Sequence, residues 1–127
     1  MSDFVLSSDQ KAQGELAEFI GAIYKTTTPF IQEYHGSWGS LAVSRNLYRG
    51  LQPLESDTHI FVVIGGPVLY FCSNEFLCGD YPVGGTRKIY NWWLNGVMRW
   101  DEDLSGPFAI LIVDKANHRV TFITDLM

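Results

Sequence analysis

The sequence has few cysteines, few cationic residues and no long apolar run. Of its 127 residues only Cys72 and Cys78 are cysteines. If both lay on one strand they would stand about 20 Å apart, too far for a disulfide. Two buried free thiols are therefore favoured over a disulfide or a metal pair, and the fold has to be held by its apolar core.

The scarcity of cations limits the class of partner. Nine lysines and arginines are scattered along the chain, and the net charge is −5. Phosphate affinity comes from clustered cations, so this composition argues against a nucleic-acid partner. An acidic surface suits a basic protein instead.

Membrane and secretion signals are also missing. No apolar run approaches the ~20 residues that span a bilayer, and the first residues lack the basic region and apolar core of a secretory signal. We therefore expect a cytoplasmic protein that does not contact a membrane. With 46% hydrophobic residues at this length, residues 1–127 are expected to form a single domain.

The apolar residues that are present concentrate in residues 104–125. Residues 108–113 form a near-continuous apolar run that suits a strand covered on both faces, and residues 119–124 alternate apolar and polar side chains. Asp114 and Asn117 are turn formers between the two segments. The pattern predicts a β-hairpin of two buried strands, which needs further layers to be stable.

Other patterns predict the elements around this hairpin. Apolar residues at spacings of three and four indicate amphipathic helices, and short apolar runs bounded by glycine or proline indicate strands. The predicted elements are a helix at 9–25, strands at 40–45, 59–64 and 68–71, and a second helix at 87–99 capped by Thr86. Their order predicts an α+β fold with helices packed on antiparallel sheets.

Candidate chemistry is sparse. His35, His59 and His118 lack the spacing of a metal site, and neither cysteine stands in a motif with a histidine, so no metal or cofactor is expected. Trp92 and Trp93 are neighbours on the second predicted helix and cannot both face one core. One of them is expected to be partly exposed or to meet a partner, where tryptophan is a frequent hot-spot residue.

Three blocks of the sequence lie in an order and at spacings that match one family. They are Ser40-Leu-Ala-Val-Ser-Arg45 followed by Gln52-Pro53-Leu54, Phe61-Val-Val-Ile-Gly65-Gly66, and Leu104-Ser-Gly-Pro-Phe-Ala109 with the hairpin behind it. Together they resemble the class II glutamine amidotransferases, in particular the N-terminal domain of asparagine synthetases. The resemblance implies an αββα fold like that of the N-terminal-nucleophile hydrolases, with two antiparallel sheets between helices.

The resemblance also implies a set of catalytic residues, which this chain largely lacks. The family's N-terminal cysteine attacks the side-chain amide of glutamine with its own amino group as base, and Ser2 stands at that position. The oxyanion asparagine corresponds to Ile64, the glutamate of the same turn to Gly66, and the amine-binding aspartate to about Gly85. Arg45 alone matches, where the family binds the glutamine carboxylate. The resemblance therefore implies a catalytically inactive domain.

The family continues beyond this hairpin into further strands and a synthetase domain. A sheet truncated here would leave a free edge or an uncovered face near residues 119–125, and free edges pair with other chains. We therefore expect a protein-binding module with Trp92, Thr124 and Asp125 at its partner surface. Its partner would be a basic bacterial toxin, neutralised by this chain as an immunity protein, or a separate synthetase domain.

Two other functions stay open. The chain would be a glutamine amidotransferase or N-terminal hydrolase if loss of Met1 exposed the amine of Ser2. It would be a carboxylate-binding protein if Arg45 kept its family role without hydrolysis. Release of ammonia from glutamine and binding of glutamine distinguish these two from a protein-binding module.

Overall fold

The computed structural model describes residues 4–9, 14–24, 30–44, 51–65, 68–70, 76–77 and 85–125. The described helices are α1 (Glu15–Ile23), α2 (Gly85–Leu94) and α3 (Trp100–Asp103). The described strands are β1 (Phe4–Ser7), β2 (Ile31–Gly36), β3 (Gly39–Ser44), β4 (Leu54–Glu55), β5 (His59–Gly65), β6 (Val68–Tyr70), β7 (Phe76–Leu77), β8 (Leu104–Ser105), β9 (Phe108–Asp114) and β10 (Arg119–Thr124).

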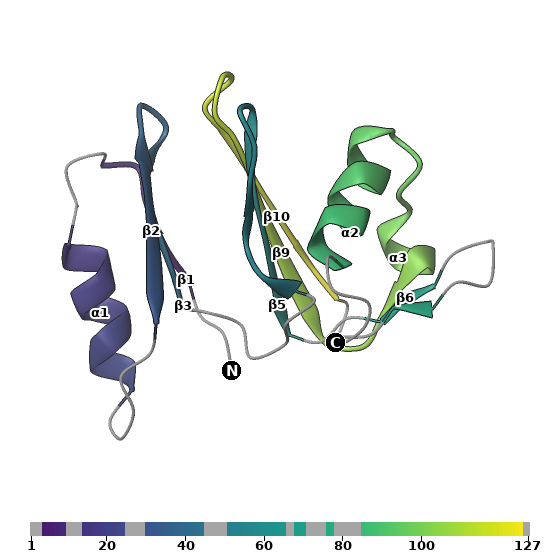
Figure 1. Ribbon diagram of the computed structural model, residues 1–127, viewed down its shortest axis with the longest axis horizontal. Helices are drawn as coiled ribbons and strands as arrows, with labels where there is room; N and C mark the ends of the chain where they lie inside the picture. Colours follow the sequence, from purple (N-terminus) through teal and green to yellow (C-terminus); the bar gives the residue numbers. More distant parts are fainter. Residues whose placement is uncertain are drawn as a thin grey trace.

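These elements form layers in the order helix, sheet, sheet, helix (Figure 1). The first sheet has the strand order β1-β3-β2 and the second the order β10-β9-β5-β4, and every pairing in them is antiparallel. A smaller sheet, β7-β6-β8, lies beside α3. The α+β class and the layering of helices on antiparallel sheets are thus confirmed.

Helix α1 covers the outer face of the first sheet. Leu16 and Ile20, four residues apart, point inward and pack with Ala42 of the central strand β3. The helix is shorter than the predicted 9–25. Asp9 is not helical, and Gly14, with a φ of 85°, has a non-helical backbone, so the helix begins at Glu15. Residues 10–13 and 25 lie outside the described residues.

The core lies on both faces of β5 and β9. The face toward the first sheet carries Ile60, Val62, Leu111 and Val113, which pack against Tyr34, Leu41 and Val43. The opposite face carries Phe61, Val63, Phe108, Ile110 and Ile112, which pack against Ile89 and Tyr90 of α2. Burial on both faces explains why these two segments are near-continuous apolar runs. The predictions of strands at 59–64 and 108–113 are confirmed.

The hairpin between β9 and β10 closes as predicted through Asp114 and Asn117. The backbone N–H of Asn117 donates to Asp114 Oδ1 at 3.1 Å, and its side-chain amide donates to Oδ2 at 2.8 Å. His118 then takes φ of 51°, which returns the chain to the second strand. The expectation that both strands are buried is wrong, however, because β10 is an edge strand with nearly every residue exposed.

The second predicted helix, 87–99, ends five residues early. The backbone N–H of Gly96 donates to the Trp93 carbonyl at 3.0 Å, and the N–H of Val97 donates to the Trp92 carbonyl at 3.2 Å. With φ of 70° at Gly96, this is the pattern by which a glycine terminates a helix. Gly96 was a stop signal that the apolar spacing of Trp93 and Val97 masked.

Candidate functional site

Of the site residues predicted from sequence, the structure describes Trp92, Thr124 and Asp125. Ser2 and Arg45 lie outside the described residues, so their roles stay predictions. Trp92 lies on α2, whereas Thr124 ends β10 and Asp125 follows it, with the Asp125 N–H donating to the Phe108 carbonyl at 3.2 Å. Thr124 is exposed and Asp125 half-buried, which places these two at the outer edge of the second sheet.

The tryptophan pair meets the expectation in part. Trp92 and Trp93 are both half-buried, so the expected partial exposure is confirmed, but both pack against the core cluster under the second sheet, so the inference that they cannot both face one core is wrong. The role of Trp92 at a partner surface stays a prediction.

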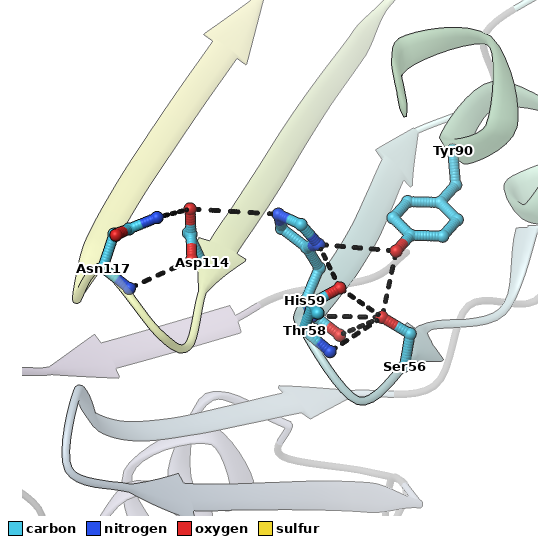
Figure 2. Close-up of polar contacts among 6 residues, drawn as sticks. All are labelled: Ser56, Thr58, His59, Tyr90, Asp114 and Asn117. Atoms are coloured by element: carbon cyan, nitrogen blue, oxygen red, sulfur yellow. Dashed lines mark hydrogen bonds and ion pairs between the residues drawn. The ribbon is translucent and has the colours of Figure 1, made fainter. Parts of the chain in front are cut away.

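A polar cluster around His59 is the main concentration of polar contacts on the second sheet (Figure 2). His59 and Asp114 are directly paired across β5 and β9, with Nε2 4.0 Å from the Asp114 carboxylate. The other ring nitrogen, Nδ1, lies 2.7 Å from the Thr58 hydroxyl and 3.4 Å from the Tyr90 hydroxyl. Trp93 stands edge-on to the imidazole, with ring centroids 5.0 Å apart.

The hydroxyls of this cluster are engaged in closing a turn. The Ser56 hydroxyl accepts the backbone N–H of His59 at 3.0 Å and lies 3.0 Å from the Tyr90 hydroxyl. Lys115 donates to the Ser56 carbonyl at 2.7 Å and pairs with Glu55 at 3.0 Å. A serine that accepts local backbone N–H groups is a turn former. The cluster therefore ties β4, β5, β9 and α2 together at one end of the sheet.

Electrostatics at this end favours the ionised form of Asp114. The side-chain hydrogen bond from Asn117 is the largest cause, and the backbone hydrogen bond from Asn117 adds to it, so the pKa of Asp114 is lowered from its ordinary value of 3.8. Across the described part of the chain, no group of three or more histidine, cysteine, aspartate or glutamate side chains could hold a metal ion.

A second feature is the exposure of β10, the strand that ends one side of the second sheet. Cross-strand neighbours on one face form the row Val62, Leu111 and Phe122, with exposures of 1%, 2% and 54%. In the adjacent row Val120 is 39% exposed, although its neighbours Ile60 and Val113 are fully buried. Apolar side chains therefore continue along the core rows into solvent.

The backbone of β10 offers hydrogen-bonding groups on the same side. Asp125 donates its N–H to the Phe108 carbonyl, so the groups of alternate residues before it, Ile123 and Thr121, also face β9. The N–H and C=O groups of Val120, Phe122 and Thr124 therefore point away from the sheet. We call these three residues, with their outward backbone and the side chains of Val120 and Phe122, the β10 edge.

Sequence reasoning located this edge only in part. Alternation over 119–124 correctly indicated a strand, and the resemblance implied a free edge or an uncovered face here. The exposure of Val120 and Phe122 was missed because apolar residues at alternate positions are the usual sign of burial. No pattern in the sequence indicated that β10 is the last described strand on its side of the sheet.

Comparisons with known proteins found no match for this chain. No family model, no curated protein and no solved structure matches it. None of the described helices has the length and apolar composition needed to cross a membrane.

Proposed function

We propose that this protein is a protein-binding module that captures a β-strand of its partner along the β10 edge. One observation carries the proposal: the four-stranded sheet ends on a strand with exposed side chains and with backbone groups that face outward. An added strand gains affinity from main-chain hydrogen bonds and specificity from its alternate side chains. The β10 edge supplies both kinds of contact.

The apolar part of the edge suits a partner strand with apolar side chains at alternate positions. Val120 and Phe122 lie on the face of the sheet that meets the first sheet, and the Phe122 ring lies 5.7 Å from that of Phe4 on β1. A strand added beside β10 would cover the exposed parts of Val120 and Phe122 and extend the existing core rows. Removing this area from water favours binding at about 25 cal/mol per Å² before the costs of association.

We propose in addition that the chain has the αββα fold of the N-terminal-nucleophile hydrolases but does not catalyse their reaction. The layer order of α1, two antiparallel sheets and α2 supports that fold. Ile64 packs against the core between the two sheets, and Gly85 is buried at the start of α2. Neither position offers the polar side chain that the family uses, which supports a binding function over hydrolysis.

The charge of the chain narrows the class of partner. A net charge of −5 favours association with a basic protein, because complementary charge raises the rate of encounter. The narrower form of the proposal is an immunity protein whose β10 edge receives a strand of a basic toxin. This form depends on charge alone, whereas strand capture depends on the β10 edge.

Strand capture is tested with dye-labelled heptapeptides that alternate valine or phenylalanine with threonine and carry one lysine. In Thr124→Pro the outward N–H is removed without touching the bonds to β9, and Thr124→Ala is the matched control that keeps it. We expect at least one peptide to bind the unmodified chain and Thr124→Ala, and to bind Thr124→Pro about tenfold more weakly. Fluorescence anisotropy measures the affinities.

Hydrogen exchange adds a readout at the level of single amides. The N–H groups of Phe122 and Thr124 should exchange fast in the free monomer and slowly with peptide bound, while Thr121 and Ile123 stay slow throughout. Equal binding by Thr124→Pro, or no binding by any peptide, would contradict strand capture. Ammonia release from glutamine that Ser2→Ala abolishes would instead favour the amidotransferase alternative.

A further inference from the structure

The residues of β10 are arranged so that the strand complements itself in the antiparallel direction. Arg119 begins the strand, Asp125 follows its end, and Phe122 lies midway between them. If two copies face each other with Phe122 opposite Phe122, Arg119 of each copy lies opposite Asp125 of the other. A two-fold axis through Phe122 and perpendicular to the sheet generates this arrangement.

The outward backbone groups fit the same register. Residues directly opposite in an antiparallel pair exchange both hydrogen bonds only when the groups of both point toward each other. In this register Phe122 meets Phe122 and Val120 meets Thr124, and all of these residues belong to the outward set established by the Asp125 to Phe108 bond. Charge and hydrogen-bond geometry therefore select one alignment independently.

Neighbouring registers satisfy only one of these requirements or neither. A shift of one residue places the outward groups of one strand against the inward groups of the other, so the ladder cannot form. A shift of two residues keeps the ladder but moves Asp125 away from Arg119 and places unlike side chains opposite each other. The alignment centred on Phe122 also brings two exposed aromatic rings together, which stabilises cross-strand pairs.

We infer that in the pure protein the β10 edge is occupied by β10 of a second copy, paired antiparallel with Phe122 at the two-fold axis. The two four-stranded sheets then form one continuous sheet, and Val120 and Phe122 become covered. This inference rests on the proposed function, because it names the strand that fills the same edge. Any other partner strand would have to displace the second copy.

The net charge does not prevent this association. Two chains of net charge −5 repel each other, but repulsion between exposed charges more than about 8 Å apart is largely screened at physiological ionic strength. The paired charges at Arg119 and Asp125 act at contact distance, where like charges would be strongly unfavourable. Local pairing therefore controls the register of this association.

Single charge reversals test the register directly. Arg119→Asp places two acidic residues opposite each other, and Asp125→Arg places two basic residues opposite each other. Each variant alone should have a dimerisation affinity at least about tenfold lower than that of the unmodified chain. An equimolar mixture of the two variants should recover dimers, because in the mixed pair every acidic position faces a basic one. Glu18→Arg, an exposed reversal on α1 with the same change in charge as Asp125→Arg, is the control.

Sedimentation of the chain of residues 1–127 over a concentration series measures the association. Circular dichroism checks that each variant is folded. A monomeric unmodified chain up to about 1 mM, unchanged dimers in both single variants, or a mixture that stays monomeric would each overturn the inference. Peptide capture by a chain that does not dimerise would leave the proposed function standing, whereas loss of both dimer and peptide binding would remove it.

Discussion

Strands β9 and β10 belong to one hairpin and contain similar apolar residues, yet they have opposite environments. Leu111 of β9 is 2% exposed, and Phe122, its neighbour directly across the hairpin, is 54% exposed. Strand β9 lies between β5 and β10 with core on both faces, while β10 ends the sheet. Within this row of cross-strand neighbours, an apolar side chain is buried where strands flank it on both sides and is exposed where the sheet ends.

The largest effects are expected when the two neighbours across the hairpin, Leu111 and Phe122, are each truncated to alanine. Leu111→Ala leaves a cavity between the sheets, and we expect the free energy of unfolding to fall by about 2–5 kcal/mol. Phe122→Ala removes a side chain that is mostly in solvent, and the loss should stay below about 1 kcal/mol. Urea unfolding of dilute monomer measures both values. Equal losses would mean that β10 is part of the core.

A second test concerns Tyr34, which lies in the same core cluster as Leu111 and Val113, between the two sheets. Its hydroxyl is buried and has no hydrogen-bond partner among the described residues. Tyr34→Phe removes this unsatisfied group, and we expect the free energy of unfolding to rise by about 1 kcal/mol. A clear decrease in the free energy of unfolding would show that the hydroxyl has a hydrogen-bond partner. The core between the two sheets would then be more polar than the buried side chains of β9 indicate.

The same residue predicts an alkaline loss of stability. Burial, with a smaller contribution from the Glu55 carboxylate, raises the pKa of Tyr34 from 10.0 to about 12. The folded state therefore holds the phenolic proton more tightly than the unfolded state does, so this contribution to stability is lost as the pH rises from 10 to 12. Unfolding midpoints across that range should fall less steeply in Tyr34→Phe than in the unmodified chain.

The smallest effect is expected at the turn that joins β9 to β10. The lowered pKa of Asp114 means that its carboxylate stabilises the folded state above pH 3.8, and that this contribution is lost as the pH falls below that value. Asn117→Ala removes the largest cause, so the pKa of Asp114 should move back toward 3.8. An NMR titration of Asp114 in both proteins measures the change, and an unmoved pKa would assign the shift to another group.

Much of the fold was predictable because local patterns reported burial correctly. The runs at 59–64 and 108–113 are near-continuous and apolar, which only strands covered on both faces require. Asp114 and Asn117 predicted the turn because their side chains can satisfy the turn backbone themselves. The predicted helix at 87–99 was wrong beyond Leu94, since Gly96 ended it while the apolar spacing continued.

The candidate site was predictable only as a location. The resemblance directed attention to residues 119–125, and Thr124 and Asp125 lie at the edge that the structure places there. Val120 and Phe122 were counted toward the core because alternation cannot show whether the layer opposite a residue extends far enough to cover it. The turn network of Ser56, His59 and Tyr90 was missed because its members come from segments that are distant in the sequence.

By itself, the sequence determined that β10 would be a strand, where its turn would lie, and which side chains would share a face. These properties depend on neighbours within a few residues and on a period of two. Only the tertiary structure decided that β10 would end the sheet, leaving the β10 edge exposed, because strand order depends on which distant segments pair.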